Sequence, residues 1–193
     1  MQDNYKTAAW RIIPTSTPTV LKKCTKCNKK MEFYCSERFR VNANSSRVDI
    51  WLIYKCIKCD STWKLTIKKG IRPQDIPRQL FDQYISNDKS LAWTYAFDRN
   101  FLKQNDCTVQ YSNVGYTIEG LEDLCMPMHV KITSQFSFDL KLSALLAGVL
   151  GISVSKLQTY VRAEAVTSDC DIMKYRIRAD LDVYFHCDLF AAC

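Results

Sequence analysis

The sequence has no hydrophobic run long enough to cross a bilayer, because its longest apolar stretch, residues 142–152, is short and interrupted. Nothing near Met1 combines a charged start with an apolar core, as a secretion signal does. Internal repeats and low-complexity tracts are also missing. With 47% hydrophobic and 24% charged residues the composition is that of an ordinary folded protein. We therefore expect a cytoplasmic protein without membrane contact.

Catalytic motifs are also scarce. The chain has only two histidines, His129 and His186, each in a strand-like context where a hydrogen-bonded, partly buried role is expected. There is no glycine-rich phosphate loop, nucleophile elbow or H-E-x-x-H motif. The sequence therefore predicts a protein that is not an enzyme. The alternative is an enzyme whose pocket lies between two modules, which needs distant carboxylates to converge.

Positive charge is concentrated in one part of the chain. Residues 1–80 contain 17 lysines and arginines against six acidic residues, whereas residues 81–193 contain ten against 14. A basic segment and a mildly acidic remainder indicate two modules with different surfaces. The first module is suited to a polyanionic partner.

Alternation of apolar and polar residues predicts an all-β first module. Residues 38–44, 47–55 and 62–68 alternate along each run and are expected to form strands. Pro14 and Pro18 exclude a helix near residues 10–20, so this segment is expected to be an extended arm or an edge strand.

The second module is expected to mix helices and strands. Glycine, two prolines and charges between residues 68 and 77 indicate the boundary. Beyond it the pattern predicts a helix over 88–103, strands over 108–118, 129–138 and 175–185, and two helices near 141–163. Gly151 is expected to end the first helix of this pair and Ser153 to cap the second.

Four of the ten cysteines form two C-x-x-C pairs, Cys24 with Cys27 and Cys56 with Cys59. Each pair places two thiolates on one side of a tight turn, and two such turns complete a tetrahedral shell. Asn28 and Asp60, which follow the pairs, tolerate the left-handed conformation that such a turn needs.

These cysteines therefore predict one structural Zn²⁺ bound by Cys24, Cys27, Cys56 and Cys59. Redox chemistry or an iron–sulfur cluster is the weaker alternative, since a redox C-x-x-C needs only one pair in a strand-to-helix setting. Four thiolates leave no open position for water, so catalytic zinc is not expected. The six other cysteines have no regular spacing and are interpreted as buried or incidental thiols: Cys35, Cys107, Cys125, Cys170, Cys187 and Cys193.

Cations on the strands of the first module are candidate nucleic-acid contacts. They could neutralise phosphates, while Trp51, Tyr54 or Trp63 could stack on bases. The alternative is an ordinary solvated face whose aromatic residues are buried. The candidates in this module are Lys22, Lys23, Lys29, Lys30, Arg38, Arg40, Lys64 and Lys68.

The paired helices near 141–163 resemble those of helix-turn-helix units and of the S4-type RNA-binding fold. The resemblance rests on the glycine and serines of the turn between the helices. Lys156 and Arg162 are the nearby cations that could contact RNA. Glu164 and Ala165 occupy the place where S4-like domains carry a glycine. The alternative is a pair of core helices joined by a short turn.

The chain as a whole resembles a bacterial family known as domain of unknown function 1062. The resemblance rests on Trp10 and the prolines after it, both cysteine pairs, and the segments 38–44, 49–56 and 62–63. It extends more weakly through residues 96–98 and 142–161. The family has no established activity, so the resemblance implies a zinc-ribbon-like N-terminus and no substrate.

The sequence thus predicts an α+β protein in two parts. Residues 1–72 are expected to form an all-β, zinc-ribbon-like basic module, and residues 78–193 a mixed α/β domain with an S4-like or helix-turn-helix-like helix pair. The expected function is that of an accessory protein that binds nucleic acid, RNA more than DNA. The alternative is a protein-interaction adaptor in which zinc is purely structural.

Overall fold

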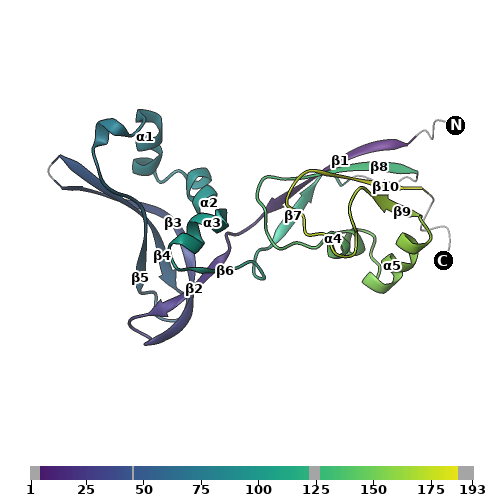
Figure 1. Cartoon of the computed structure of the whole chain (residues 1–193), viewed down its shortest axis with the longest axis horizontal. Helices are drawn as coiled ribbons and strands as arrows, with labels where there is room; N and C mark the ends of the chain where they lie inside the picture. Colours follow the sequence, from purple (N-terminus) through teal and green to yellow (C-terminus); the bar gives the residue numbers. More distant parts are fainter. Residues whose placement is uncertain (1–4, 45, 122–126, 187–193) are drawn as a thin grey trace. The chain divides into compact units, whose positions relative to one another are not determined.

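The computed structural model describes residues 5–44, 46–121 and 127–186, and the chain divides into two compact units. Unit 1 joins residues 1–15 to 115–193, and unit 2 comprises residues 16–114. Each unit is built on a five-stranded sheet of its own (Figure 1). With two sheets and five α-helices in the described part of the chain, the fold is mixed α/β.

Unit 2 is built on an antiparallel sheet with the strand order β5-β4-β3-β2-β6. Burial alternates along β4, where Ile50, Leu52 and Tyr54 face the core and the residues between them are only partly buried. This confirms the alternation expected from the sequence. The strands are β2 (Thr19–Cys24), β3 (Lys29–Asn44), β4 (Arg47–Cys56), β5 (Thr62–Ile71) and β6 (Thr108–Gln110).

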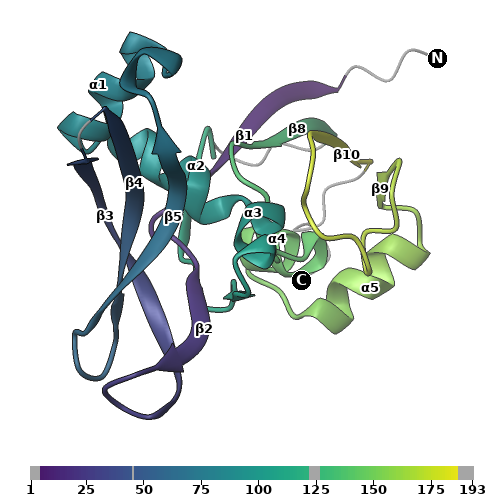
Figure 2. The same cartoon turned by 60° about the vertical axis from the view of Figure 1, so that its left-hand side comes forward.

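Three helices cover one face of this sheet, and the views in Figures 1 and 2 agree on their placement. The core between the two layers includes Phe39, whose ring centroid lies 5.1 Å from that of Tyr84. After the 3-10 turn η1 (Pro73–Asp75), the helices are α1 (Arg78–Ser86), α2 (Lys89–Phe97) and α3 (Arg99–Gln104).

The single helix expected over 88–103 is in fact two helices, so that expectation was wrong. Asp98 has an extended backbone, and its side chain accepts a hydrogen bond from the Phe101 N–H. Asp88 caps α2 in the same way through Leu91. An aspartate that caps a new helix competes with continuation of the old one, and periodicity alone does not register this.

A bulge in β3 fixes the helical layer against the sheet. Between Cys35 and Phe39 the register with β4 shifts, and Glu37 takes a left-handed conformation with φ of 59°. The Phe39 N–H donates to Asn87 Oδ1 at 2.6 Å, and Trp93 Nε1 donates to Glu37 Oε1 at 2.6 Å. The Phe39 N–H is therefore paired with the residue that ends α1, and the Glu37 side chain in the bulge is paired with α2.

Unit 1 has the strand order β7-β1-β8-β10-β9, in which β1 is parallel to β8 and antiparallel to β7. The segment near residues 10–20 was expected to be an extended arm or an edge strand. Its first part instead belongs to β1, an interior strand, so that expectation was wrong. Pro14 is the last residue of β1, where its missing N–H interrupts little of the ladder. The strands are β1 (Lys6–Pro14), β7 (Tyr116–Glu119), β8 (Met128–Ser134), β9 (Val166–Ser168) and β10 (Leu181–Phe185).

The helix pair of unit 1 is present where the sequence placed it. Helix α4 (Leu142–Val149) and helix α5 (Val154–Arg162) lie below the sheet in Figure 1 and meet at a bend of 101°. Gly151 has a φ of 64°, and Ser153 Oγ accepts from the Lys156 N–H at 3.1 Å. The helix stop and the cap are confirmed. Among the described residues, no single helix is long and apolar enough to span a membrane.

Three expected strands differ in extent from the prediction. Residues 108–118 form β6 and β7, which belong to different sheets, with a turn between them in which the Val114 N–H donates to the Tyr111 carbonyl. Residues 129–138 and 175–185 contribute only β8 and β10, and Arg176 makes an isolated bridge to Lys141. Alternation of residue types does not reveal where a strand loses its partner.

The two units differ from the expected modules 1–72 and 78–193. Segments distant in sequence make the difference: β1 joins the sheet of β8, α1 and α2 pack on β3, and α3 packs on β6. The segment 68–77 lies inside unit 2. Unit 2 holds 18 lysines and arginines against nine acidic residues, so the basic character belongs to this unit.

Candidate metal centre

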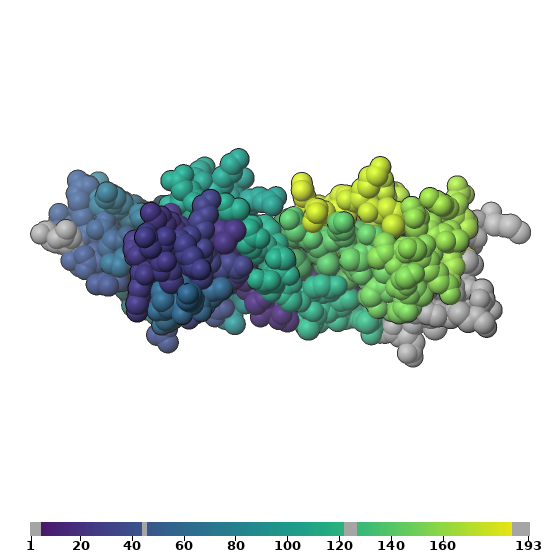
Figure 3. Space-filling view, turned by 90° about the horizontal axis from the view of Figure 1, so that it is seen from below, coloured from purple at the N-terminus to yellow at the C-terminus, as the bar shows by residue number. Residues whose placement is uncertain are grey.

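Two turns at one end of the unit 2 sheet bring four cysteines together. Cys24 ends β2 and Cys56 ends β4, while Cys27 and Cys59 lie in the turns that lead into β3 and β5. The four sulfur atoms all lie within 4.8 Å of one another. The cluster could hold a metal ion and has the four members expected from the sequence. In the space-filling view, the dark violet hairpin of β2 and β3, which carries the first pair, is at the surface (Figure 3).

The spacing of the sulfur atoms suits a tetrahedral ion. Cys24 Sγ lies 3.6 Å from Cys59 Sγ, and Cys27 Sγ lies 4.0 Å from Cys56 Sγ. Four sulfurs at about 2.3 Å from a central ion would lie about 3.8 Å from one another. The two printed spacings are therefore close to those of a four-thiolate shell around one ion.

The backbone after each cysteine pair has the conformation expected from the sequence. Asn28 has a φ of 52° and Asp60 a φ of 55°, both in the left-handed region. The Cys27 N–H donates to Cys24 Sγ at 3.4 Å, and the Asp60 N–H donates to the Cys56 carbonyl at 2.9 Å. These bonds hold each turn in the shape that points two sulfurs to the same side.

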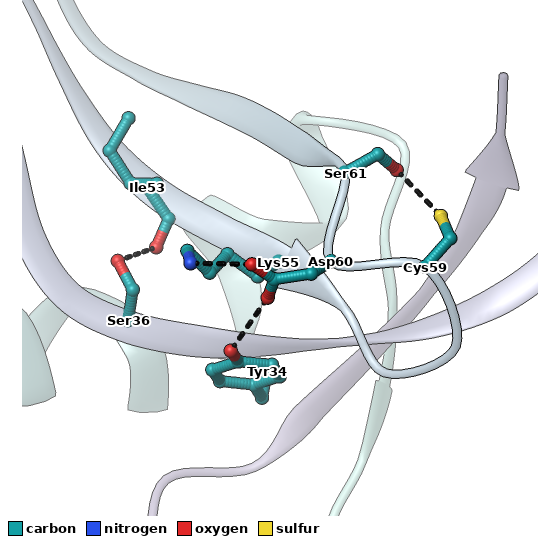
Figure 4. Close-up of polar contacts among 7 residues, drawn as sticks. All are labelled: Tyr34, Ser36, Ile53, Lys55, Cys59, Asp60 and Ser61. Carbon is teal, nitrogen blue, oxygen red and sulfur yellow. Dashed lines mark hydrogen bonds and ion pairs between the residues drawn. The ribbon is translucent and has the colours of Figure 1, made fainter. Parts of the chain in front are cut away.

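Ser61 is the one polar side chain from outside the four cysteines for which the described residues show contact with their sulfurs. Its Oγ lies 3.2 Å from Cys24 Sγ. It also lies 3.1 Å from Cys59 Sγ (Figure 4). The hydroxyl and the Cys27 N–H lower the pKa of the Cys24 thiol to about 6, and Ser61 also lowers the pKa of Cys59. Hydrogen bonds and burial raise the pKa of Cys27 to about 12. These contacts therefore favour the thiolate form of Cys24 and shift the pKa of Cys59 in the same direction.

Sequence reasoning missed Ser61, although its place two residues after the second pair was a usable signal. A hydroxyl there can reach back over the turn to the sulfurs. Metal ligands commonly need such outer partners for their orientation and charge.

Asp60 connects the second turn to the sheet. Its carboxylate accepts from Tyr34 Oη at 3.0 Å and from Lys55 Nζ at 2.8 Å (Figure 4). These two donors lower the pKa of Asp60, and the carboxylate raises the pKa of both partners. The turn is thereby anchored to β3 and β4 as well as to its own backbone.

The remaining cysteines do not form a second cluster within the described part of the chain. Cys35 and Cys107 are buried, and burial raises the pKa of Cys35 to about 12. Cys170 is half-buried in unit 1. Cys125, Cys187 and Cys193 lie outside the described residues.

Four of the expected nucleic-acid contacts share one face of the unit 2 sheet. They are Lys23, Lys30, Arg40 and Lys64. Paired residues of neighbouring strands lie on the same face of a sheet. The rows that carry these cations alternate with rows that enter the core: Lys23–Lys30, Arg40–Trp51–Thr66 and Ile53–Lys64. The helices cover the opposite face. We call the uncovered side the outer face.

The other expected contacts lie elsewhere. Lys22 is on the core-facing side of β2, with Nζ 4.6 Å from the Trp63 ring centroid, and Tyr54 is fully buried. Lys29 and Lys68 pair with Cys24 and Ile50 at the ends of core-facing rows, and Arg38 lies in the β3 bulge. Lys156 and Arg162 are on α5 of unit 1.

The two histidines are hydrogen-bonded, as the sequence predicts. His129 Nε2 lies 2.7 Å from Asp182 Oδ1, and its ring stacks on Tyr184 at 4.6 Å. His186 contacts Tyr5 Oη at 2.6 Å and Thr167 Oγ1 at 2.7 Å, although its side chain is exposed rather than partly buried.

A comparison with protein-family models gives one match. The model described as protein of unknown function (DUF1062) matches residues 41–172, which is more than half of the chain. The matched range includes Cys56 and Cys59 and begins after Cys24 and Cys27. Searches of curated proteins and of solved structures gave no match.

Proposed function

We propose that this chain, which belongs to the DUF1062 family, is a zinc-binding accessory protein that binds single-stranded nucleic acid, RNA in preference to DNA. One structural Zn²⁺ at the four cysteines holds unit 2 together, and the outer face of its sheet contacts the nucleic acid. The observation that carries the proposal is the placement of Arg40 and Lys64 around Trp51 on a face that no helix covers.

Zinc is the ion that the donor set favours. Four thiolates in a tetrahedral arrangement suit Zn²⁺ or an iron–sulfur centre, and hard oxygen-seeking cations are excluded. The shared contact of Ser61 and the sulfur spacings of 3.6 and 4.0 Å support a single-ion shell.

Trp51 is the stacking platform of the outer face. Its cross-strand partners are Arg40 and Thr66, and Lys64 Nζ lies 5.1 Å from its ring centroid. Base stacking on an aromatic side chain contributes about 1–3 kcal/mol and needs unpaired bases. A cationic face around one aromatic ring therefore favours a single strand over a duplex.

Carboxylates on this face are already engaged with the protein. Glu32 accepts from Thr19 and Asn113, Asp49 accepts from the Gly70 N–H at 2.7 Å, and Asp60 is held by Tyr34 and Lys55. By contrast, within the described ranges no carboxylate lies at ion-pairing distance from Lys23, Lys30 or Arg40. These cations are therefore available for phosphate groups.

The preference for RNA is supported by the helix pair of unit 1. In the resemblance to S4-like domains, Glu164 stands at the position of a glycine. Glu164 has a φ of 56°, the left-handed conformation that glycine adopts most easily. Lys156 and Arg162 lie on the preceding helix α5. A second contact with RNA at this helix is part of the proposal.

The test is a titration of binding at several salt concentrations, with fluorescence anisotropy as the readout. The labelled oligonucleotides are a single-stranded RNA, a single-stranded DNA of the same sequence and the corresponding duplex RNA. We expect the single-stranded RNA to bind most tightly, with an affinity that falls steeply as salt rises. Trp51→Ala is expected to weaken binding about 5- to 100-fold, and Arg40→Ala to lower the salt slope by about 0.7. Lys22→Ala, which removes a cation from the core side, is the control. Binding that is absent, or equally affected by Lys22→Ala and Arg40→Ala, would refute the proposal.

A second candidate function is that of a protein-interaction adaptor with a purely structural zinc site. It is favoured by the open edge of β5, which pairs with β4 alone in the described chain. Capture of one protein partner by the full chain after nuclease treatment would support this function, and its loss on nuclease treatment would favour nucleic-acid binding.

A further inference from the structure

We propose that the free edge of β5 binds an extended segment of another protein by strand addition, and that this segment alternates acidic with apolar residues. The proposal concerns the backbone edge of the sheet and does not rest on nucleic-acid binding by the outer face. The partner's backbone would pair with residues 62–66, and its side chains would continue the two faces of the sheet.

The topology leaves this edge open. β5 is the last strand of the order β5-β4-β3-β2-β6, and its register joins it to β4 from Thr62 to Ile71. No backbone hydrogen bond between the described residues reaches its other side. β5 has ten residues, which is long for an edge strand, and natural proteins usually shorten or cover such edges.

Only the first half of the edge is regular enough to accept a partner. Pairing with β4 runs without interruption from Thr62 to Thr66, and the register then shifts twice before Ile71. Gly70, with a φ of 60°, lies in this irregular half. Bulges of this kind re-aim a strand and end its pairing, so a partner strand is limited to about the first five residues.

Like charge opposes pairing of this edge with a second copy of the chain. In an antiparallel pair of two β5 strands centred on the regular half, Lys64 of one copy would lie opposite or diagonal to Lys64 of the other. Like charges opposite each other destabilise a sheet, and edge lysines are a common device against self-association. The same lysine attracts a carboxylate on a different chain.

The side chains next to the edge define the partner's chemistry. On the outer face the regular half presents Lys64 between Thr62 and Thr66, all three exposed. On the core side it carries the partly buried Trp63 and Ile67, with Lys22 Nζ over the Trp63 ring and the fully buried Leu65 between them. A partner strand would therefore place carboxylates beside Lys64 and apolar side chains beside Trp63 and Ile67.

The experiment uses the full chain with its metal and a labelled short synthetic peptide that alternates glutamate with valine and threonine. Anisotropy should show saturable binding, and a peptide with lysine in place of glutamate should not bind. Lys64→Glu should weaken binding at least about tenfold, whereas the matched change Lys131→Glu in unit 1 should leave it unchanged.

Backbone pairing is tested with two versions of the peptide that carry N-methyl groups on alternate residues. In strand addition only every second N–H of the peptide faces the protein, so one version should lose binding and the other should keep it. Equal binding by both versions would show a purely electrostatic contact and overturn the proposal. Dimerisation of the full chain through β5, detected by sedimentation and abolished by Lys64→Glu, would overturn it as well.

The two proposals fail separately. Trp51→Ala is expected to reduce oligonucleotide binding and to leave peptide binding intact, because its side chain lies on the outer face and not at the edge. Absence of peptide binding by a chain that still binds single-stranded RNA would refute strand addition alone.

Discussion

Lys22 Nζ on β2 lies 4.6 Å from the ring centroid of Trp63 on β5, although two strands separate β2 from β5 in the sheet. Lys22 Nζ also donates to the Asn105 carbonyl at 3.3 Å. Cys24 Sγ at the end of β2 and Cys59 Sγ in the turn before β5 are 3.6 Å apart. The core-facing side of this end of the sheet therefore holds a cation over an aromatic ring and the cysteine cluster, while β5 pairs with β4 alone among the described strands.

Removal of one cluster cysteine should abolish metal binding and unfold unit 2. Cys56→Ser, at a buried position, is expected to lower the zinc content of the purified chain from about one equivalent to near zero and to remove the thermal transition of this unit, because structural zinc contributes directly to folding. Metal analysis and calorimetry measure both effects. Cys170→Ser, which changes a half-buried cysteine of unit 1, should retain the metal. Full zinc content in Cys56→Ser would refute the assignment of the site.

Loss of the Ser61 hydroxyl should weaken the site without unfolding the protein. The hydroxyl lowers the pKa of Cys24 and Cys59, so Ser61→Ala raises both pKa values and protons compete with the metal up to a higher pH. We expect metal affinity to fall about 10- to 100-fold and the release of metal on acidification to begin at a higher pH than in the unaltered chain.

Competition with a chelator across a pH series measures this shift. The control is Ser36→Ala, which removes a hydroxyl that donates to the Ile53 carbonyl at 2.8 Å away from the cluster (Figure 4). A pH profile of metal release that is unchanged in Ser61→Ala would contradict the role given to this residue.

Lys22→Ala should reduce stability rather than affinity for nucleic acid. The ammonium over the Trp63 ring is expected to contribute about 0.5–1 kcal/mol, and the hydrogen bond to Asn105 adds to the loss. Urea unfolding should show a destabilisation of about 1–2 kcal/mol. A neutral effect on unfolding together with weaker RNA binding would reverse the assignment of Lys22 to the core side.

Glu164→Gly should stabilise unit 1. Glu164 is exposed and has a φ of 56°, a conformation that costs a non-glycine residue about 1 kcal/mol. Urea unfolding is expected to show a gain of up to about 1 kcal/mol, reduced by the extra freedom of glycine in the unfolded chain. Ala163→Gly, next to it with a φ of −84°, should instead destabilise. A loss of stability in both variants would show that the conformation of Glu164 is not strained.

Local structure was predictable where a short segment determines its own conformation. The left-handed residues Asn28 and Asp60, the helix stop at Gly151 and the cap at Ser153 were all expected from the sequence and are present. Each depends on the backbone preference of one residue and on partners within a few positions.

Elements whose boundaries depend on distant partners were predicted less well. Residues 88–103 form two helices because Asp98 caps the second one, and residues 175–185 form a strand only where β8 and β9 are available for pairing. Of the eight cations expected on the first module, only four lie on the outer face, because a one-residue bulge reverses the side of every later residue and the register of β2 to β5 decides the rest.

The sequence by itself determined the members of the cysteine cluster, since Cys24, Cys27, Cys56 and Cys59 follow from spacing and turn chemistry alone. Only the tertiary structure decided that Ser61 reaches two of the sulfurs and that β1 joins the sheet formed by the second half of the chain. It also decided that Lys22 points to the core while Lys64 points outward. The physical reason is range: a C-x-x-C turn is specified by four consecutive residues, whereas strand register, bulges and the curl of a sheet are set by contacts between residues far apart in the chain.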